Sequence, residues 1–200
     1  MKQSPMPIIL SLLVILLSSC KSSLRNDVVS FHEGKLPRSG TIRIAPMDTV
    51  KQRSLEFSHY KSLIGERLNQ LGYQVVDRDE PSELVANIDY SISEGQTQIR
   101  SSSNNYVRYH FNYGRYYHPF YYGFYDTWPP EQYNYTVYNR QLKMNISRIG
   151  PDAEVLFEGR VQSIGKAKEI ATVMPYMITA MFNNFPGENA VTKVVTIEKQ

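Results

Sequence analysis

The sequence predicts an α+β fold, in which a single mixed, largely antiparallel sheet carries two packed helices and a long aromatic-rich insert between central strands. Two patterns indicate the layers. Apolar and polar residues alternate over residues 86–92, as in a strand with one buried face, and apolar residues recur at helical spacing over residues 55–71. The insert, residues 106–138, holds 15 of the 24 aromatic residues of the chain.

The chain begins with a segment typical of a bacterial lipoprotein leader. Lys2 precedes ten residues, 8–17, that are apolar except for Ser11. This run has the length of a signal peptide and is too short to cross the ~30 Å hydrocarbon core of a membrane. The stretch Leu17-Ser18-Ser19-Cys20 resembles a lipobox, in which cleavage before the cysteine leaves a lipidated first residue.

We therefore expect residues 1–19 to be a signal peptide and Cys20 to carry a membrane anchor; the alternative is an ordinary secretory signal beside an incidental cysteine. Lys21 follows Cys20. In lipoprotein sorting of the enteric type, a residue other than aspartate there favours the outer membrane, so we expect an outer-membrane protein that faces the periplasm. Cys20 is the only cysteine, so its acylation would leave no thiol for a disulfide or a nucleophile.

After cleavage the chain would be nearly neutral. It would carry 21 basic and 19 acidic side chains, a net charge of +2, and we expect no nucleic-acid partner. Residues 20–40 are polar and are broken by glycine and proline, so they are predicted to form a lipidated flexible tether. Val28, Val29 and Phe31 could dock on the body. One domain is expected over residues 41–200, large enough for a hydrophobic core.

Periodicity sets the order of the elements in this domain. Gly72 stands where the first helix should end, and Gly65 in mid-helix predicts a close approach to the sheet, since it costs about 1 kcal/mol relative to alanine. A second helix carries an apolar stripe over residues 173–182, with Pro175 in its first turn. The predicted strands are 41–45, 73–76, 86–92, 142–147, 155–161 and 191–197, of which 142–147 and 155–161 form an antiparallel meander.

The aromatic insert is a feature that a purely structural domain would not need. An extended hairpin and a long loop over the sheet edge both fit its position between two strands. Tyrosine suits packing on the sheet, contact with a glycan or protein, and the membrane headgroup layer alike. The candidate contact residues are Tyr117, Tyr121, Tyr122, Phe124, Tyr125 and Trp128.

Several short motifs resemble one known family. They are Ser54-Leu55-Glu56, Leu71-Gly72-Tyr73, residues 86–90, Met174-Pro175-Tyr176, Ala180-Met181-Phe182 and Phe185-Pro186-Gly187. Over most of residues 36–197 the chain resembles the bacterial lipoprotein family named domain of unknown function 4136. That family has no assigned activity, so the resemblance implies a lipoprotein and a fold and adds no catalytic residue. We expect Phe182 and Phe185 to close the core.

No recognised catalytic or metal motif is present. The four histidines, His32, His59, His110 and His118, lack metal-ligand spacing, and there is no nucleophile elbow or phosphate-binding glycine loop. The acidic run of residues 77–83 is interpreted as a solvated turn. We expect neither a metal nor another cofactor.

Two functional hypotheses follow. The first is a non-catalytic binding or structural module of the cell envelope, anchored through Cys20, whose aromatic insert contacts an envelope protein or peptidoglycan. The second is a cell-wall hydrolase that acts on envelope glycan or peptide, with His110 or His118 as acid-base groups.

Overall fold

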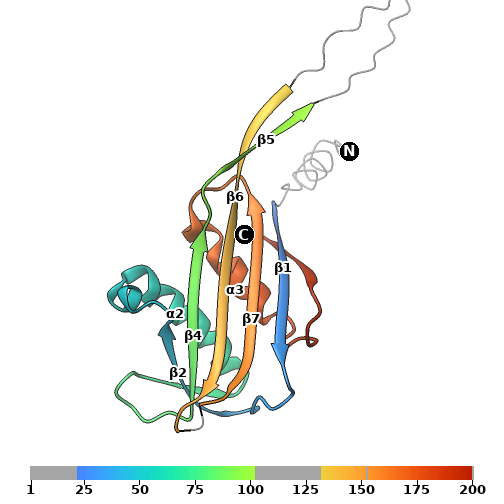
Figure 1. The fold of residues 1–200 in the computed structure, drawn as a ribbon. Coiled ribbons are helices and arrows are strands. Elements are labelled where there is room, and N and C mark those ends of the chain that lie inside the picture. The colour runs from blue at the N-terminus through green and yellow to red at the C-terminus, as the bar shows by residue number, and fades with distance from the viewer. Residues whose placement is uncertain (1–21, 102–131, 152, 200) are drawn as a thin grey trace, which may run out of the picture.

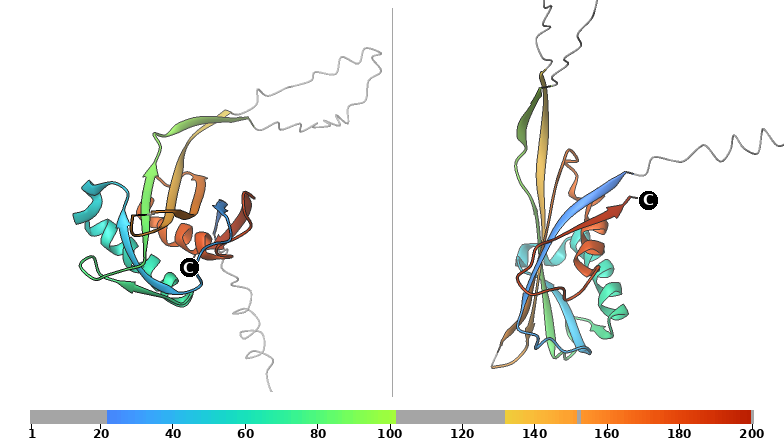
Figure 2. Two further views of the ribbon diagram at one scale, coloured as in Figure 1. Left: turned by 60° about the horizontal axis from the view of Figure 1, so that its bottom comes forward. Right: turned by 90° about the vertical axis from the view of Figure 1, so that its right-hand side faces the viewer.

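The computed structural model describes residues 22–101, 132–151 and 153–199. Within them, eight strands form one sheet in the order β3-β2-β4-β6-β7-β1-β8, and β5 pairs with β6 outside this path. Both long helices lie on the same face of the sheet (Figure 1, Figure 2). The predicted α+β class, with a mixed sheet and two packed helices, is confirmed.

The described residues form two α-helices, two short 3-10 turns and eight strands. The helices are α2 (Leu55–Gln70) and α3 (Met174–Phe182), with short 3-10 turns η1 (Thr49–Arg53) and η2 (Ile170–Thr172). The strands are β1 (Ser23–His32), β2 (Gly40–Pro46), β3 (Tyr73–Val76), β4 (Leu84–Ile92), β5 (Gln96–Ser101), β6 (Gln132–Arg148), β7 (Val155–Gly165) and β8 (Lys193–Glu198). Only β2 pairs in parallel, with β3 and β4; the other described pairs are antiparallel, as predicted for most of the sheet.

The core lies between the sheet and the two helices. In strands β2, β4 and β6, alternate residues are apolar and face the helices, as expected of strands with one buried face. Ser54 caps the N-terminus of helix α2, since its Oγ accepts a hydrogen bond from the Phe57 N–H at 3.3 Å. The buried helix residues are Phe57, Tyr60, Ile64 and Leu68 from α2, and Met174, Met177, Ile178, Ala180 and Met181 from α3.

The expected closure of the core by two phenylalanines is confirmed. The ring of Phe185 lies 4.8 Å from that of Phe157 and 5.5 Å from that of Phe182, measured between centroids. The Ser30 hydroxyl donates a hydrogen bond to the Pro186 carbonyl at 2.6 Å. The segment after α3 is thereby attached to β1.

The prediction of a flexible tether over residues 20–40 is wrong for residues 23–32. These residues form β1, which pairs with β7 on one side and β8 on the other, so the domain starts near Ser23 rather than at residue 41. The inward positions of β1 include the polar residues Asn26 and Ser30, which interrupt the apolar alternation that marks a strand in sequence. Val28 packs against the core, in agreement with the expectation that apolar residues of this segment could dock on the body of the domain.

A two-stranded arm extends the sheet at one end, where β6 is far longer than the predicted strand 142–147. The arm consists of residues 96–101 of β5 and 132–137 of β6, paired from Gln96↔Val137 to Ser101↔Gln132. It projects beyond the main sheet (Figure 1). Residues 132–138 of the predicted insert therefore lie in β6, which fits the hairpin alternative at its base. The rest of the insert lies outside the described residues.

Candidate functional site

The described residues hold only part of the predicted site. Cys20, the aromatic candidates Tyr117, Tyr121, Tyr122, Phe124, Tyr125 and Trp128, and the histidines His110 and His118 all lie outside them. His32 Nε2 is 3.3 Å from the Gly187 carbonyl oxygen, and the His59 ring packs beside Tyr60. These two histidines therefore contact the fold's own backbone or core.

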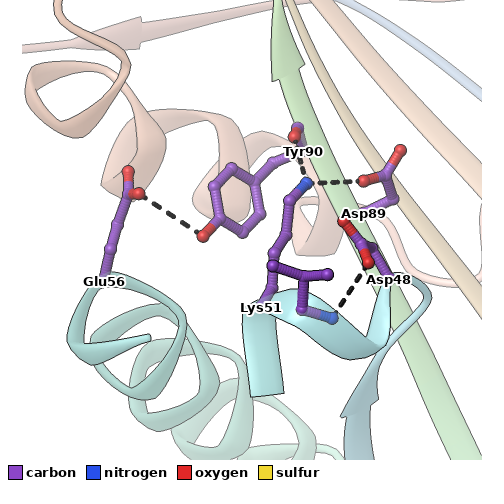
Figure 3. A network of polar contacts seen from close by, with 6 residues as sticks. Asp48, Lys51, Glu56, Asp89 and Tyr90 are labelled. Atoms are coloured by element: carbon purple, nitrogen blue, oxygen red, sulfur yellow. Dashed lines mark hydrogen bonds and ion pairs between the residues drawn. The ribbon is translucent and has the colours of Figure 1, made fainter. Parts of the chain in front are cut away.

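A polar network lies where β2 ends and α2 begins. Strand β2 ends at Pro46, opposite Ile88, so the last residues of β4 have no parallel neighbour. Lys51 of η1 fills this place: its Nζ donates to Asp89 Oδ1 and to the Tyr90 carbonyl, each at 2.8 Å (Figure 3). The same ammonium lies 4.3 Å from the centroid of the Tyr90 ring, within cation–π distance.

Glu56, in the first turn of α2, joins two buried tyrosines. The Tyr60 hydroxyl donates to Glu56 Oε1 at 2.7 Å, and the Tyr90 hydroxyl donates to Oε2 at 3.4 Å. The two rings meet edge to face, 5.0 Å apart. Because Glu56 has a position near the helix N-terminus, its negative charge also suits the helix dipole.

Burial and hydrogen bonding favour the protonated form of the two tyrosine hydroxyls and the charged form of the Asp89 carboxyl group. Burial, followed by the hydrogen bond to Glu56, raises the pKa of Tyr60 above its usual value, and burial raises the pKa of Tyr90. The hydrogen bond from Lys51 lowers the pKa of Asp89. Both hydroxyls thus stay protonated donors, and the network fastens η1 and α2 to β4. The alternating pattern of residues 86–92 predicts Tyr90 on the buried face, whereas Glu56 stands out in the sequence only as part of the motif Ser54-Leu55-Glu56, and Lys51 belongs to no pattern.

A small cavity lies under the loop that follows α3. Its volume is about 40 Å³, and its walls come from the loop that follows α3 and from residues of β1, β7, β8 and α3. Glu188 and Lys193, at its edge, form an ion pair of 2.9 Å. Ligand pockets usually measure roughly 300–1,000 Å³, so this cavity is too small for an organic ligand.

The arm presents a mixed aromatic and basic surface. We define the arm face as Gln98, Arg100, Tyr133, Tyr135, Ile164 and Lys166. Register places Gln98 opposite Tyr135 and Arg100 opposite Tyr133, and the Lys166 Nζ lies 5.1 Å from the Tyr135 ring centroid. Tyr133 is 55% exposed and Ile164 is 66% exposed. Tyr133 and Tyr135 belong to the predicted aromatic insert, of which the structure describes residues 132–138.

The described residues form neither a cluster of metal-ligating side chains nor a helix that could span a membrane. In this part of the chain, no three histidine, cysteine, aspartate or glutamate side chains stand close enough to hold a metal ion. Its helices also include none with the length and apolar character needed to cross a membrane.

Comparison with known proteins gives a family match and distant likenesses. The family model described as Domain of unknown function (DUF4136) matches residues 30–187. An uncharacterised protein of Zymomonas mobilis is 29% identical over 59 residues, which cover 30% of this chain and 22% of that protein.

Two solved structures are distantly similar. A PDZ domain protein from Parabacteroides distasonis has a TM-score of 0.49 at 10% identity, covering 94% of this chain and 42% of the other. A PelC variant from Paraburkholderia phytofirmans, solved as a dodecamer, has a TM-score of 0.39 at 8% identity, covering 78% and 92%. Likenesses this weak carry no argument about function.

Proposed function

The chain belongs to the family described as Domain of unknown function (DUF4136), and we propose that it is a lipid-anchored protein of the cell envelope. We place the anchor at Cys20, on the periplasmic side of the outer membrane. We propose that it acts as a non-catalytic binding or structural module, with the aromatic segment 106–138 as its contact surface for an envelope protein or peptidoglycan. The family supplies no activity, so the proposal rests on the residues of this chain.

The leader pattern in the sequence is the observation that carries this proposal. An apolar run over residues 8–17 leads into the lipobox-like stretch Leu17-Ser18-Ser19-Cys20, which is the order of parts in a cleaved lipoprotein leader. The Lys199 N–H donates a hydrogen bond to the Ser22 carbonyl at 2.8 Å, so the fold begins two residues after the proposed anchor.

The arm supports a contact role for the aromatic segment. The chain leaves the arm at Ser101 and returns at Gln132, and these two residues are directly paired. Residues 102–131 thus start and end at the outer end of the arm, away from the core. A segment in that place can be changed without removing buried side chains from the described core, as expected of a binding segment.

The anchor is tested by Cys20→Ala. A lipidated Cys20 would hold the wild-type chain in the membrane fraction, and the variant should appear in the soluble or unprocessed fraction because acylation supplies the attachment. Mass spectrometry of the N-terminal peptide checks for the acyl groups. An unmodified Cys20, or a variant that partitions with membranes as wild type does, would refute the anchor.

The contact role is tested by replacing residues 102–131 with Asn-Gly. A two-residue turn fits because Ser101 and Gln132 are paired, and Asn-Gly favours the tight turns of hairpins. We expect an unchanged circular dichroism spectrum and loss of the envelope components that cross-link to the wild-type chain in intact cells. Lys143→Gln, on the open face of β6, serves as the control. An unchanged set of cross-linked components would refute the contact role.

A further inference from the structure

We propose that the arm face lies against the lipid surface of the membrane in which the chain is anchored. This inference rests on the proposed anchor at Cys20 and names the surface that the arm meets. It concerns Gln98, Arg100, Tyr133, Tyr135, Ile164 and Lys166, and it does not depend on the partner of residues 102–131.

The start of the fold and the arm lie at the same end of the sheet. Asp27 of β1 is opposite Gln162 of β7, and the Ser163 hydroxyl donates to the Arg25 carbonyl at 3.0 Å, so β1 begins beside the end of β7. Strand β7 ends at Gly165, which is opposite Tyr138, the residue of β6 from which the arm continues. Figure 1 shows the start of β1 at the arm end.

The length of the arm then brings it to the membrane. Ser22 is held to Lys199, and two further residues reach at most about 7 Å to Cys20. The arm has six residue pairs beyond Tyr138, which at the rise of an antiparallel strand amounts to about 20 Å. Because the arm is longer than the link to the anchor and lies at the same end of the sheet, it is within reach of a membrane that holds Cys20.

The arm face is continuous with the end of β7. Lys166 comes directly after β7, and its ammonium lies over the Tyr135 ring. Ile164 is opposite Asn139, which shares a face of β6 with Tyr133 and Tyr135, so these side chains form one surface, which is the candidate for lipid contact because of its chemistry.

The chemistry of the arm face fits a lipid surface. Tyrosine rings favour the headgroup layer, and the exposed Ile164 is an aliphatic side chain that can reach the acyl boundary. Arg100 and Lys166 supply positive charge, while residues 96–101 and 132–137 contain no acidic residue. Anionic phosphates attract such basic side chains over a Debye length.

Single labels on the full, acylated chain test this inference. Because acylated Cys20 has no free thiol, one introduced cysteine can carry an environment-sensitive fluorophore. The vesicles contain phosphatidylethanolamine and phosphatidylglycerol, with nitroxide quenchers on part of the acyl chains. Labels at Gln98→Cys and Ile164→Cys, on the arm face, should lose most of their fluorescence.

Two matched positions serve as controls. Ile99 is 68% exposed and points to the opposite face of β5 from Gln98, and Val155 is 54% exposed at the other end of β7 from Ile164. Labels at Ile99→Cys and Val155→Cys should keep their fluorescence. Arg100→Gln and Lys166→Gln should each shift arm docking away from the membrane by about fivefold, given the contribution of one basic side chain near anionic lipid.

The outcomes separate the inference from the anchor. A full chain that floats with the vesicles but shows equal quenching at all four positions, or none, overturns the inference and leaves the anchor standing. A full chain that does not float with the vesicles overturns both. Quenching at residues 98 and 164 alone, reduced by the two charge variants, supports the inference.

Discussion

At the scale of single residues, Arg140 is the largest side chain that the described fold buries completely, with 1% exposure. Its guanidinium donates to the Ser163 carbonyl at 3.2 Å, the Ala167 carbonyl at 3.3 Å and the Ser163 hydroxyl at 3.4 Å. Among the described residues, no carboxylate pairs with it, and burial lowers its pKa. Arg140 therefore joins the end of β7 to the segment that leads into η2.

We predict that Arg140→Ala lowers the free energy of unfolding by about 3 kcal/mol, since it leaves buried carbonyls unpaired and opens a cavity. Urea denaturation measures the loss. Arg160→Ala, on the exposed side of β7, is the control and should change stability by less than about 0.5 kcal/mol. Equal effects of the two substitutions would contradict a structural role for Arg140.

Asp89 makes a pH-dependent contribution to stability. The hydrogen bond from Lys51 lowers the pKa of Asp89 in the folded state, so the folded protein binds a proton less readily than the unfolded chain. The resulting stability is fully present above the unfolded pKa of about 3.9 and is lost as pH falls through the lower folded pKa.

We predict that Asp89→Asn costs on the order of 1 kcal/mol at pH 7, since the side chains of Asp89 and Lys51 are 29% and 26% exposed. The difference from wild type should shrink as the pH drops below about 4. Denaturation at several pH values checks it. Asp79→Asn, in the exposed turn after β3, removes the same charge as a control; a difference for Asp89→Asn that persists at low pH would speak against the ion pair.

At the scale of elements, two glycines show how closely helices approach the sheet. A Cβ at Gly65 of α2 would lie 3.6 Å from Ile44 Cδ1 and 3.7 Å from Val75 Cγ1, which is ordinary contact. The predicted close approach is thus real but leaves room for a methyl group. At Gly159 of β7, a Cβ would lie 2.7 Å from Met181 Sδ of α3 and from Phe157 Cε1.

The same substitution should therefore have opposite effects at the two positions. Gly65→Ala should raise the free energy of unfolding by about 0.5–1 kcal/mol, because alanine is the better helix former. Gly159→Ala should lower it by about 1–3 kcal/mol, since Met181 and Phe157 would have to move. Thermal and urea denaturation measure both changes. Destabilisation at Gly65 would mean that α2 lies closer to β2 than described.

The helices and strands were predicted accurately where the local sequence pattern is complete. Helix α2 and strands β3 and β4 have regular periods and clear ends, so their sequences indicated them nearly to the residue. Strand β6 was predicted too short because Arg140, a charged residue on its buried face, interrupts the apolar alternation. Strand β5 has the sequence Gln-Thr-Gln-Ile-Arg-Ser and carries almost no apolar pattern, since it pairs only within the arm.

At the scale of the whole molecule, β1 holds the two ends of the described chain together. It lies between β7 and β8, so the strand nearest the proposed anchor is part of the sheet (Figure 2). A pull at the N-terminus would therefore act on the whole sheet rather than on a flexible link.

Hydrogen exchange can verify this arrangement. Amides of Asp27 and Val28, the residues of β1 that pair with both β7 and β8, should exchange as slowly as amides of β4 and β7, because their exposure requires the sheet to open. The arm, with only two strands, should exchange faster and provides an internal comparison. Fast exchange throughout residues 23–32 would support the flexible tether predicted from sequence. It would also contradict the placement of the anchored end of the chain near the arm.

The candidate functional residues fall into two groups: those that a local sequence pattern indicates and those that only the tertiary structure brings together. The sequence alone pointed to Cys20 and to the tyrosine-rich insert, since a leader, a lone cysteine and a biased composition are local properties. It could not find the contacts of Lys51 and Glu56 with Asp89, Tyr90 and Tyr60, because those contacts arise only where η1 and α2 pack beside β4.

The sequence by itself determined the α+β class, both long helices and most strands, since periods of two and 3.6 residues are set by the backbone. Only the tertiary structure decided that residues 23–32 belong to the sheet. Their inward positions alternate apolar and polar side chains, and Asn26 forms its hydrogen bonds with the carbonyls of Leu24 and Val195, the latter on a strand far along the chain. That pairing places the start of the fold beside the arm, because strand order and register depend on partners that no local pattern names.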